Sequence, residues 1–116
     1  MTIERLHPGS RMSQAVKHGN TLYLAGQVAK DEFATIETQT AQVLEKMDAL
    51  LAEAGTSKSK VLSVQVLLTN IADFAAMNSV YDKWIDPANP PARACWEARL
   101  ASPNLRVEII AVAALD

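Results

Sequence analysis

Two segments with helical periodicity interrupt a chain whose remaining parts are patterned for β-strands. In the first segment, from about residue 36 to residue 54, apolar residues recur at the spacing of one helix face. They are Val43, Leu44, Met47, Leu50, Leu51 and Ala54. Gly55 follows at the position where a glycine commonly ends a helix. The second helical segment follows Asn70, a favoured N-cap residue, and ends before Pro87.

Alternating or apolar-rich runs bounded by glycine and proline indicate strands elsewhere in the chain. We predict them at residues 2–7, 13–17, 21–28, 60–69, 93–97 and 105–114. The segment His18-Gly19-Asn20 has the spacing and the turn chemistry of a β-hairpin. Because each helix separates two strands, we expect right-handed crossovers within one sheet. The prediction is therefore a single α+β domain over residues 1–116.

Two helices can cover only one face of a sheet of five or six strands, yet the residues predicted for both faces are too apolar for a solvent-exposed surface. In the last strand Ile110 and Val112 point to one side, while Ala111 and Ala113 point to the other. A chain of 116 residues has no further element with which to cover the second face. We therefore infer an oligomer in which sheet faces or edges pack together.

Composition argues against several classes of protein. The formal net charge is −2 and Lys and Arg do not cluster, which argues against a nucleic-acid partner. The single cysteine rules out an internal disulfide and fits a reducing compartment. His7 and His18 are not spaced as metal ligands, so we expect no metal and no cofactor. Without a signal-peptide pattern or a membrane-length apolar run, the sequence predicts a cytoplasmic protein with no membrane partner.

A few residues carry chemistry that a plain core does not need. Arg93 shares a strand face with Cys95 and Glu97, just after a double proline, and no acidic residue immediately precedes it. Such a guanidinium is well placed to hold a carboxylate from outside the chain. Glu108 shares a face with apolar residues of the last strand, where an unpaired charge is costly. Gly26, inside a strand, indicates a bulge or a close approach to the backbone.

Short segments then match, in order, a family pattern that spans nearly the whole chain. They are Ala25-Gly26-Gln27, Glu53-Ala54-Gly55, Leu68-Thr69-Asn70-Ile71-Ala72-Asp73-Phe74, Met77-Asn78, Pro91-Ala92-Arg93-Ala94-Cys95 and Arg106-Val107-Glu108-Ile109. With them the chain resembles the RidA/YjgF family of reactive-intermediate enamine/imine deaminases, whose older members carry the label L-PSP endoribonuclease. The resemblance implies a chorismate-mutase-like subunit with a mixed sheet. It also implies a homotrimeric barrel with three pockets at the subunit interfaces.

The family's site can be carried over residue by residue. The resemblance implies that Arg93 grips the substrate carboxylate, and that the main chain of Cys95, with the adjoining Ala94, borders the substrate. It implies that Glu108 orients and deprotonates the attacking water, and that Gly26 lets the backbone approach the ligand. The implied reaction is hydrolysis of 2-aminoacrylate and other 2-imino acids to 2-oxoacids and ammonia, as in a 2-iminobutanoate/2-iminopropanoate deaminase.

The chain departs from the family pattern at Met12. Better-known members have a pocket tyrosine there, so a flexible thioether replaces an aromatic wall and a hydroxyl. The loop after Val28 is also shorter than is usual in the family. Both differences indicate a divergent subgroup, in which Met12 lines the substrate pocket.

Other interpretations of the same residues remain open from the sequence. Arg93 can instead pair with an acidic residue of a neighbouring subunit, and Glu108 can be that partner rather than a base. Cys95 alone is most often a small buried hydrophobe. The alternative function is a non-catalytic module that senses a small carboxylate metabolite in the same interfacial pocket, and the third is an endoribonuclease. Only hydrolysis needs a water-activating base, so Glu108 discriminates between the first two functions.

Overall fold

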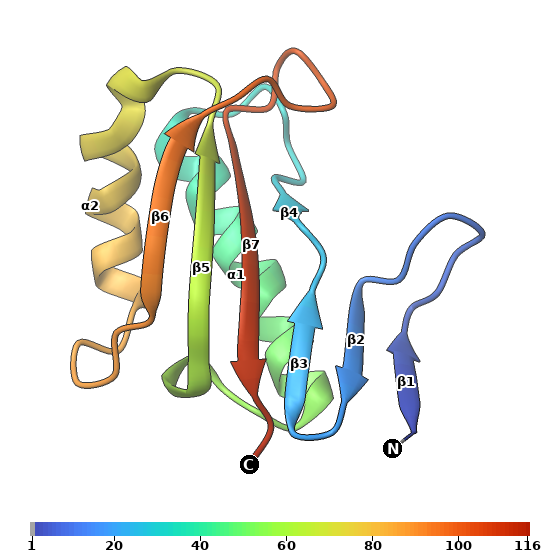
Figure 1. Cartoon of the computed structure of the whole chain (residues 1–116). Helices are drawn as coiled ribbons and strands as arrows, with labels where there is room; N and C mark the ends of the chain where they lie inside the picture. Colours follow the sequence, from blue (N-terminus) through green and yellow to red (C-terminus); the bar gives the residue numbers. More distant parts are fainter. Residues whose placement is uncertain (1) are drawn as a thin grey trace.

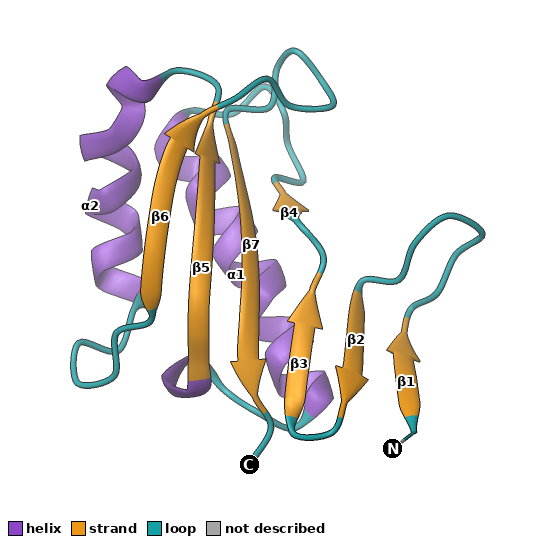
Figure 2. Ribbon diagram, viewed as in Figure 1, coloured by secondary structure: helices purple, strands orange, loops and turns teal. Residues whose placement is uncertain are grey.

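The computed structural model describes residues 2–116, in which one seven-stranded sheet is backed by two α-helices (Figure 1 and Figure 2). The strands are β1 Ile3–Leu6, β2 Ala15–His18, β3 Thr21–Leu24, β4 Gln27–Val28, β5 Val61–Leu68, β6 Ala92–Glu97 and β7 Val107–Ala114. The helices are α1 Ile36–Ala54 and α2 Phe74–Trp84, and short 3-10 turns at Lys58–Lys60 and Ile71–Asp73 precede β5 and α2. None of the helices in this range is long and apolar enough to cross a bilayer.

The strand order across the sheet is β1-β2-β3-β7-β5-β6, and β4 pairs with β7 beyond the end of β3. β5 and β6 are parallel and the other pairs are antiparallel, so the sheet is mixed. α2 forms the crossover between β5 and β6, while α1 links β4 to β5 across β7. The predicted α+β architecture, with both helices on one face of the sheet, is confirmed (Figure 1).

The second arm of the predicted hairpin, residues 21–28, is interrupted at Ala25-Gly26. This break divides the arm into β3 and β4 and brings the strand count to seven rather than the expected five or six. The hairpin loop has two residues, between His18 and Thr21, and Gly19 adopts a φ of +61° there. A positive φ at the first loop residue is what a type II′ loop requires, and glycine adopts it without strain.

The core lies between the helices and one face of the sheet. Nine residues of α1 are buried, and all six apolar residues predicted for its inner side are among them. In β7 the alternate residues are buried against this layer, and they are Val107, Ile109, Ala111 and Ala113. The predicted end of the first helix is confirmed, because Gly55 ends α1 with a φ of +89°. Asn70 caps the 3-10 turn before α2 rather than α2 itself, whose N-cap is Asp73, and the Asn70 side chain accepts from the N–H of Ala72 at 3.0 Å.

β5 departs from the predicted alternation at its first residues. A bulge between Val61 and Ser63 shifts the register of β5 against β7. The alternation predicts Leu62 on the same face as Val64, but Val61 is buried and Leu62 is 53% exposed. The prediction is therefore wrong at Leu62, because Leu62 is the extra, unpaired residue of the bulge and its side chain points out of the core.

The opposite face of the sheet, called here the bare face, has no helix over it (Figure 1). On β7 the residues that point to it are half-buried and include Glu108, Ile110 and Val112. The strand register places Tyr23 and Trp96 on the same face, where they are 48% and 42% exposed. Large apolar side chains on an uncovered sheet support the prediction that copies of this chain pack together.

Gln39 is fully buried on α1 and joins segments that are far apart in the sequence. Its Nε2 lies 3.1 Å from the main-chain oxygens of Glu32, Ala34 and Asn104. Its Oε1 accepts from the main-chain N–H of Arg106 at 2.8 Å. One side chain thus ties the loop before α1 to the segment that leads into β7.

We expect the substitution Gln39→Leu to lower the free energy of unfolding by about 3 kcal/mol, because it leaves buried main-chain groups without partners. Chemical denaturation at a fixed protein concentration measures this loss. Gln42→Leu is the matched control, since that side chain accepts a single bond, from the N–H of Asp31 at 2.9 Å. The control is expected to lose about 1 kcal/mol. Equal losses in the two variants would contradict the special role of Gln39.

Candidate functional site

Arg93 lies on β6, the edge strand, and its side chain points to the helix layer. Its Nη1 donates to Oδ1 of Asn78 on α2 at 2.8 Å. The guanidinium carbon lies 4.7 Å from the ring centroid of Tyr81 and 5.8 Å from that of Phe74. Arg93 is exposed, and within residues 2–116 it makes no ion pair. An uncompensated positive charge therefore stands at the edge of the sheet beside two aromatic rings.

The main chain of β6 provides further hydrogen-bond donors at the same edge. The N–H of Ala98 donates to the oxygen of Leu68 on β5 at 2.9 Å. Because the backbone groups of successive strand residues point alternately to the two sides, the N–H groups of Arg93 and Cys95 point away from β5. In the described part of the chain no strand lies beyond β6. These N–H groups and the Arg93 guanidinium can therefore bind an anion together.

Cys95 is half-buried on the helix side of β6, where its side chain packs against the core. Burial raises the pKa of the Cys95 thiol, and the nearby positive charge of Arg93 offsets this only in part. The thiol therefore stays protonated near neutral pH, which argues against a nucleophilic role. Ala94 is exposed and, by the alternation of the strand, points to the bare face.

Glu108 and Gly26 meet on the bare face, away from Arg93. Glu108 lies on β7 opposite Val28 of β4, and Gly26 lies in the break between β3 and β4. A Cβ on Gly26 would overlap Oε2 of Glu108 and would lie 2.9 Å from its Cδ. The carboxylate thus occupies the space that a side chain at position 26 would fill. Among the residues from 2 to 116, none forms an ion pair with Glu108.

We expect Gly26→Ala to displace the Glu108 carboxylate and to lower the free energy of unfolding by about 1 kcal/mol, as overpacking does. The double-mutant cycle with Glu108→Ala tests this cause, because the penalty should disappear once the carboxylate is removed. Gly9→Ala is the control, since the nearest atom to its new Cβ is the Met12 oxygen at 3.6 Å, an ordinary contact. An equal penalty with and without the Glu108 carboxylate would contradict the contact as its cause.

The predicted site residues fall into separate groups in one copy of the chain. Arg93 and Cys95 lie at β6 on the helix side, while Gly26 and Glu108 lie on the bare face. β5 separates β6 from β7, and adjacent strands are about 4.8 Å apart. Met12 lies in the loop between β1 and β2, at the opposite edge of the sheet from β6 (Figure 1). One copy therefore does not direct these side chains at a common point.

The neighbours of Arg93 on α2 are functional candidates that sequence reasoning misses. The helical pattern places Phe74 and Tyr81 on the inner side of α2, but it does not show which strand residue lies opposite them. A signal is present in the spacing, because residues 74, 78 and 81 lie on one side of a helix. The contact between Asn78 and Arg93 joins positions 15 residues apart and depends on how the crossover turns. Only the tertiary structure supplies that information.

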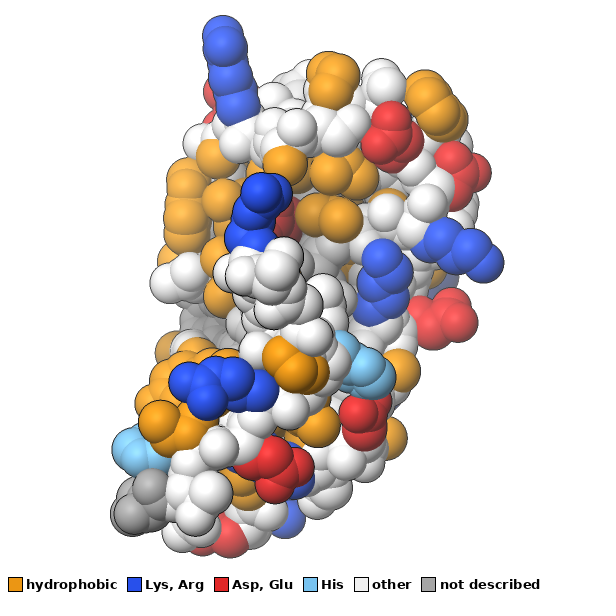
Figure 3. Space-filling model, turned by 90° about the vertical axis from the view of Figure 1, so that its right-hand side faces the viewer, with side chains coloured by type: hydrophobic (Ala, Val, Ile, Leu, Met, Phe, Trp, Pro, Cys, Tyr) orange, Lys and Arg blue, Asp and Glu red, His pale blue; other side chains and the backbone are white. Residues whose placement is uncertain are grey.

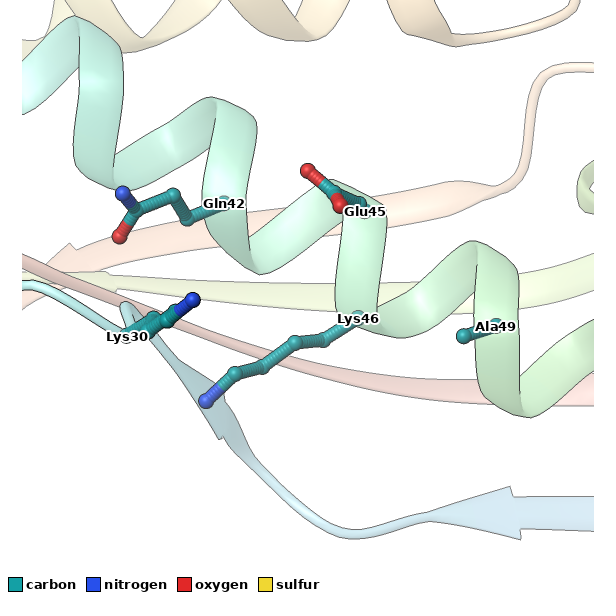
Figure 4. A pocket seen from close by; sticks show the side chains of 5 residues that line it. All are labelled: Lys30, Gln42, Glu45, Lys46 and Ala49. Atoms are coloured by element: carbon teal, nitrogen blue, oxygen red, sulfur yellow. The ribbon is translucent and has the colours of Figure 1, made fainter.

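Several open hollows lie on the surface of the described residues, and one of about 410 Å³ lies beside the loop of residues 99–103. A second, of about 230 Å³, lies over the first residues of β5 and β6 and is lined by Ser63, Val64, Gln65, Ala92, Arg93 and Ala94. Another of about 190 Å³ lies between α1 and the segment after β4, and Figure 4 shows the side chains that line it. They are Lys30, Gln42, Glu45, Lys46 and Ala49. Of these hollows, predicted site residues line only the one over β5 and β6.

Charged side chains do not gather by sign on the face shown in Figure 3, where basic, acidic and apolar groups are interspersed. Within residues 2–116, no cluster of three or more His, Cys, Asp and Glu side chains is arranged to hold a metal ion. The described residues therefore offer two features suited to chemistry, which are the hydrogen-bond donors at the edge of β6 and the Glu108 carboxylate on the bare face.

Comparison with known proteins gives matches over the full length of the chain. The family model described as endoribonuclease L-PSP matches residues 2–115. A RutC family protein from Haemophilus influenzae is 43% identical, and the match covers 97% of this chain and 98% of that protein. The crystal structure of an uncharacterized protein from Pseudomonas aeruginosa matches with a TM-score of 0.96 and 43% identity over 99% of this chain and 100% of that one. NMB1025, a YjgF family member from Neisseria meningitidis, matches with a TM-score of 0.95 and 41% identity over 98% of this chain and 95% of that one.

Proposed function

This chain belongs to the RidA/YjgF family, the L-PSP endoribonuclease family of older usage, and we propose that it hydrolyses reactive enamines and imines. The substrates are 2-aminoacrylate and other small 2-imino acids, and the products are 2-oxoacids and ammonia. In this proposal Arg93 binds the substrate carboxylate and Glu108 positions and activates water.

The reaction requires few catalytic groups from the protein. An enamine tautomerises to the imine, water adds to the imine carbon, and the carbinolamine expels ammonia to leave the carbonyl group of the 2-oxoacid. The carbon of a protonated imine is already electrophilic. Holding the carboxylate and presenting water therefore supply most of the effect through positioning.

The observation that carries the proposal is the exposed Arg93 guanidinium, which has no acidic partner in residues 2–116. Asn78 takes one of its five N–H donors, so the edge formed by Nε and Nη2 is available. Two parallel N–H groups match the two oxygens of a carboxylate in a fork, and such charge-assisted bonds are strong. The outward N–H groups of Arg93 and Cys95 add donors beside it.

Glu108 supports the catalytic half of the proposal. Its carboxylate lies against the backbone at Gly26, in the space that a side chain at position 26 would fill. A carboxylate held in this way can accept a hydrogen bond from water and take its proton as the water attacks. Cys95 and Ala94 contribute main chain beside the substrate, and Met12 lines the pocket from a neighbouring copy.

Because Arg93 and Glu108 point to opposite faces of one sheet, a site that uses both takes Arg93 from one copy and Glu108 from the next. We propose a homotrimer in which the bare faces turn inward and each interface holds one such pocket. The half-buried Ile110 and Val112 and the exposed Tyr23 and Trp96 are the apolar contacts that this packing would bury.

The test is hydrolysis of freshly generated 2-aminoacrylate and a few bulkier 2-imino acids by the purified protein. Each imine comes from an amino-acid oxidase or a dehydratase, and its disappearance is followed with semicarbazide as the trap. We expect faster imine loss, and the ranking of substrates shows what Met12 does to the pocket. No acceleration on any substrate, with the protein folded and oligomeric, would contradict hydrolysis and favour the carboxylate-sensing module.

The family label also names RNA cleavage, which the charge distribution supports less well. The net charge is −2, and basic side chains are interspersed with acidic ones in Figure 3. RNA cleavage that survives removal of Arg93 and Glu108 in a highly purified sample would restore that function.

A further inference from the structure

We propose that Asn78 is a positioning residue that holds the Arg93 guanidinium through an uncharged group and so leaves its full charge for a carboxylate ligand. This inference rests on the proposed function, because it assigns a role within the same site. If it holds, tight binding of a carboxylate ligand requires an uncharged side chain at position 78.

Three side chains on one side of α2 contact the Arg93 guanidinium. Phe74, Asn78 and Tyr81 follow one another at helical spacing and all face Arg93 on β6. Asn78 fixes one end of the guanidinium through the 2.8 Å bond to Nη1. The guanidinium carbon of Arg93 also lies 4.7 Å from the ring centroid of Tyr81 and 5.8 Å from that of Phe74, so both rings contact the same charged group. The arginine is thus oriented by three contacts, none of which carries a negative charge.

The phenol of Tyr81 also stays uncharged. Burial raises the pKa of Tyr81, the charge of Arg93 opposes this rise, and Asp82 adds to it. The hydroxyl therefore keeps its proton at neutral pH, and the ring offers Arg93 a π face rather than a phenolate. Every group on α2 that contacts the guanidinium is consequently neutral at the pH of the reaction.

A second arginine of the same chain shows the contrast. Nη2 of Arg106 lies 3.2 Å and 3.1 Å from the two carboxylate oxygens of Asp73, and the Asp73 side chain is only 14% exposed. That arginine is paired with a full negative charge and has a structural role. Asparagine instead of aspartate at position 78 orients Arg93 without the ion pair. A carboxylate there would pair with Nη1 and neutralise the guanidinium charge, which would weaken the attraction of the ligand to the Nε and Nη2 edge.

The substitution Asn78→Asp adds a negative charge but keeps the shape of the side chain. It therefore tests whether the neutrality of residue 78 matters, or only its packing against Arg93. We expect its KM for 2-aminoacrylate to rise about 30-fold, with kcat changed less than about threefold. Asn78→Ala, which only loosens the guanidinium, should raise KM about fivefold. Ser79→Asp is the charge control, since it adds the same charge at an exposed neighbouring position and should leave KM unchanged.

Binding of pyruvate, a stable 2-oxoacid product, gives a readout that does not depend on turnover. Titration calorimetry should show the same order of affinity, with wild type and Ser79→Asp tightest and Asn78→Asp weakest. An active wild type with an Asn78→Asp variant that matches it in KM and pyruvate affinity would overturn the role of Asn78 and leave the hydrolase proposal intact. A wild type that neither hydrolyses imines nor binds pyruvate would overturn the proposed function and this inference together.

Discussion

Replacing Arg93 by alanine is expected to lower kcat/KM for 2-aminoacrylate by about 10²–10⁴-fold, with the fold and the oligomer unchanged. Two hydrogen bonds from a guanidinium to a carboxylate contribute about 1.5–3 kcal/mol each, and each 1.4 kcal/mol is a tenfold change in rate. Stability should change little, because Arg93 is exposed and its one hydrogen bond to Asn78 lies at the surface. Trapping with semicarbazide measures the rate, and thermal unfolding checks the fold.

Two further substitutions define what is lost. Arg93→Lys keeps the charge but not the two parallel donors, so it should fall between wild type and Arg93→Ala. Lys46→Ala removes a positive charge from α1, on the surface drawn in Figure 4, and should keep wild-type activity. A folded Arg93→Ala protein with normal activity would remove Arg93 from the site. Lost assembly with normal activity per assembled copy would favour an ion pair across the interface instead.

Chains that carry Arg93→Ala and chains that carry Glu108→Gln, each nearly inactive alone, are expected to regain activity when they assemble together. The reason is that Arg93 and Glu108 lie on opposite faces of one sheet, so each pocket of the proposed trimer would take them from different copies. With equal amounts and random mixing in a closed ring, about a quarter of the pockets hold both wild-type residues. Co-refolding of differently tagged chains, followed by the imine assay, measures the recovered fraction.

The control for this experiment mixes Arg93→Ala chains with chains that carry both substitutions. No pocket in that mixture can contain Arg93, so no activity should return. Absence of recovery in the first mixture, although mixed oligomers are present, would contradict a shared pocket. Pyruvate binding by the Glu108→Gln protein alone completes the test, because a water-activating base is needed for turnover and not for binding.

Much of the fold follows from local patterns. The helix at residues 36–54 is predicted because its apolar period and Gly55 agree, and the structure has α1 at Ile36–Ala54. The hairpin is predicted because Gly19 supplies the turn geometry. The bulge in β5 escapes prediction because Val61 and Leu62 are both apolar, so either can point to the core without disturbing the composition of the strand.

The site is harder to derive, because its residues act through contacts between distant segments. Strand alternation correctly separates the face of Arg93 from that of Ala94, and the glycine at position 26 signals a close approach. The sequence does not show that the approaching group is the Glu108 carboxylate, since that contact joins two strands through their register. It also does not show that Asn78 lies beside Arg93. The roles of these residues in catalysis remain predictions.

Under the proposed function, the placement of Arg93 and Glu108 on opposite sides of the sheet makes activity depend on the concentration of the protein. A centre that needs two chains forms in a bimolecular step, so its abundance follows mass action. Below the dissociation constant of the assembly, activity per chain falls as the protein is diluted, whereas an enzyme with a self-contained centre keeps the same specific activity. Newly synthesised chains would therefore be inactive until their concentration is high enough for them to assemble.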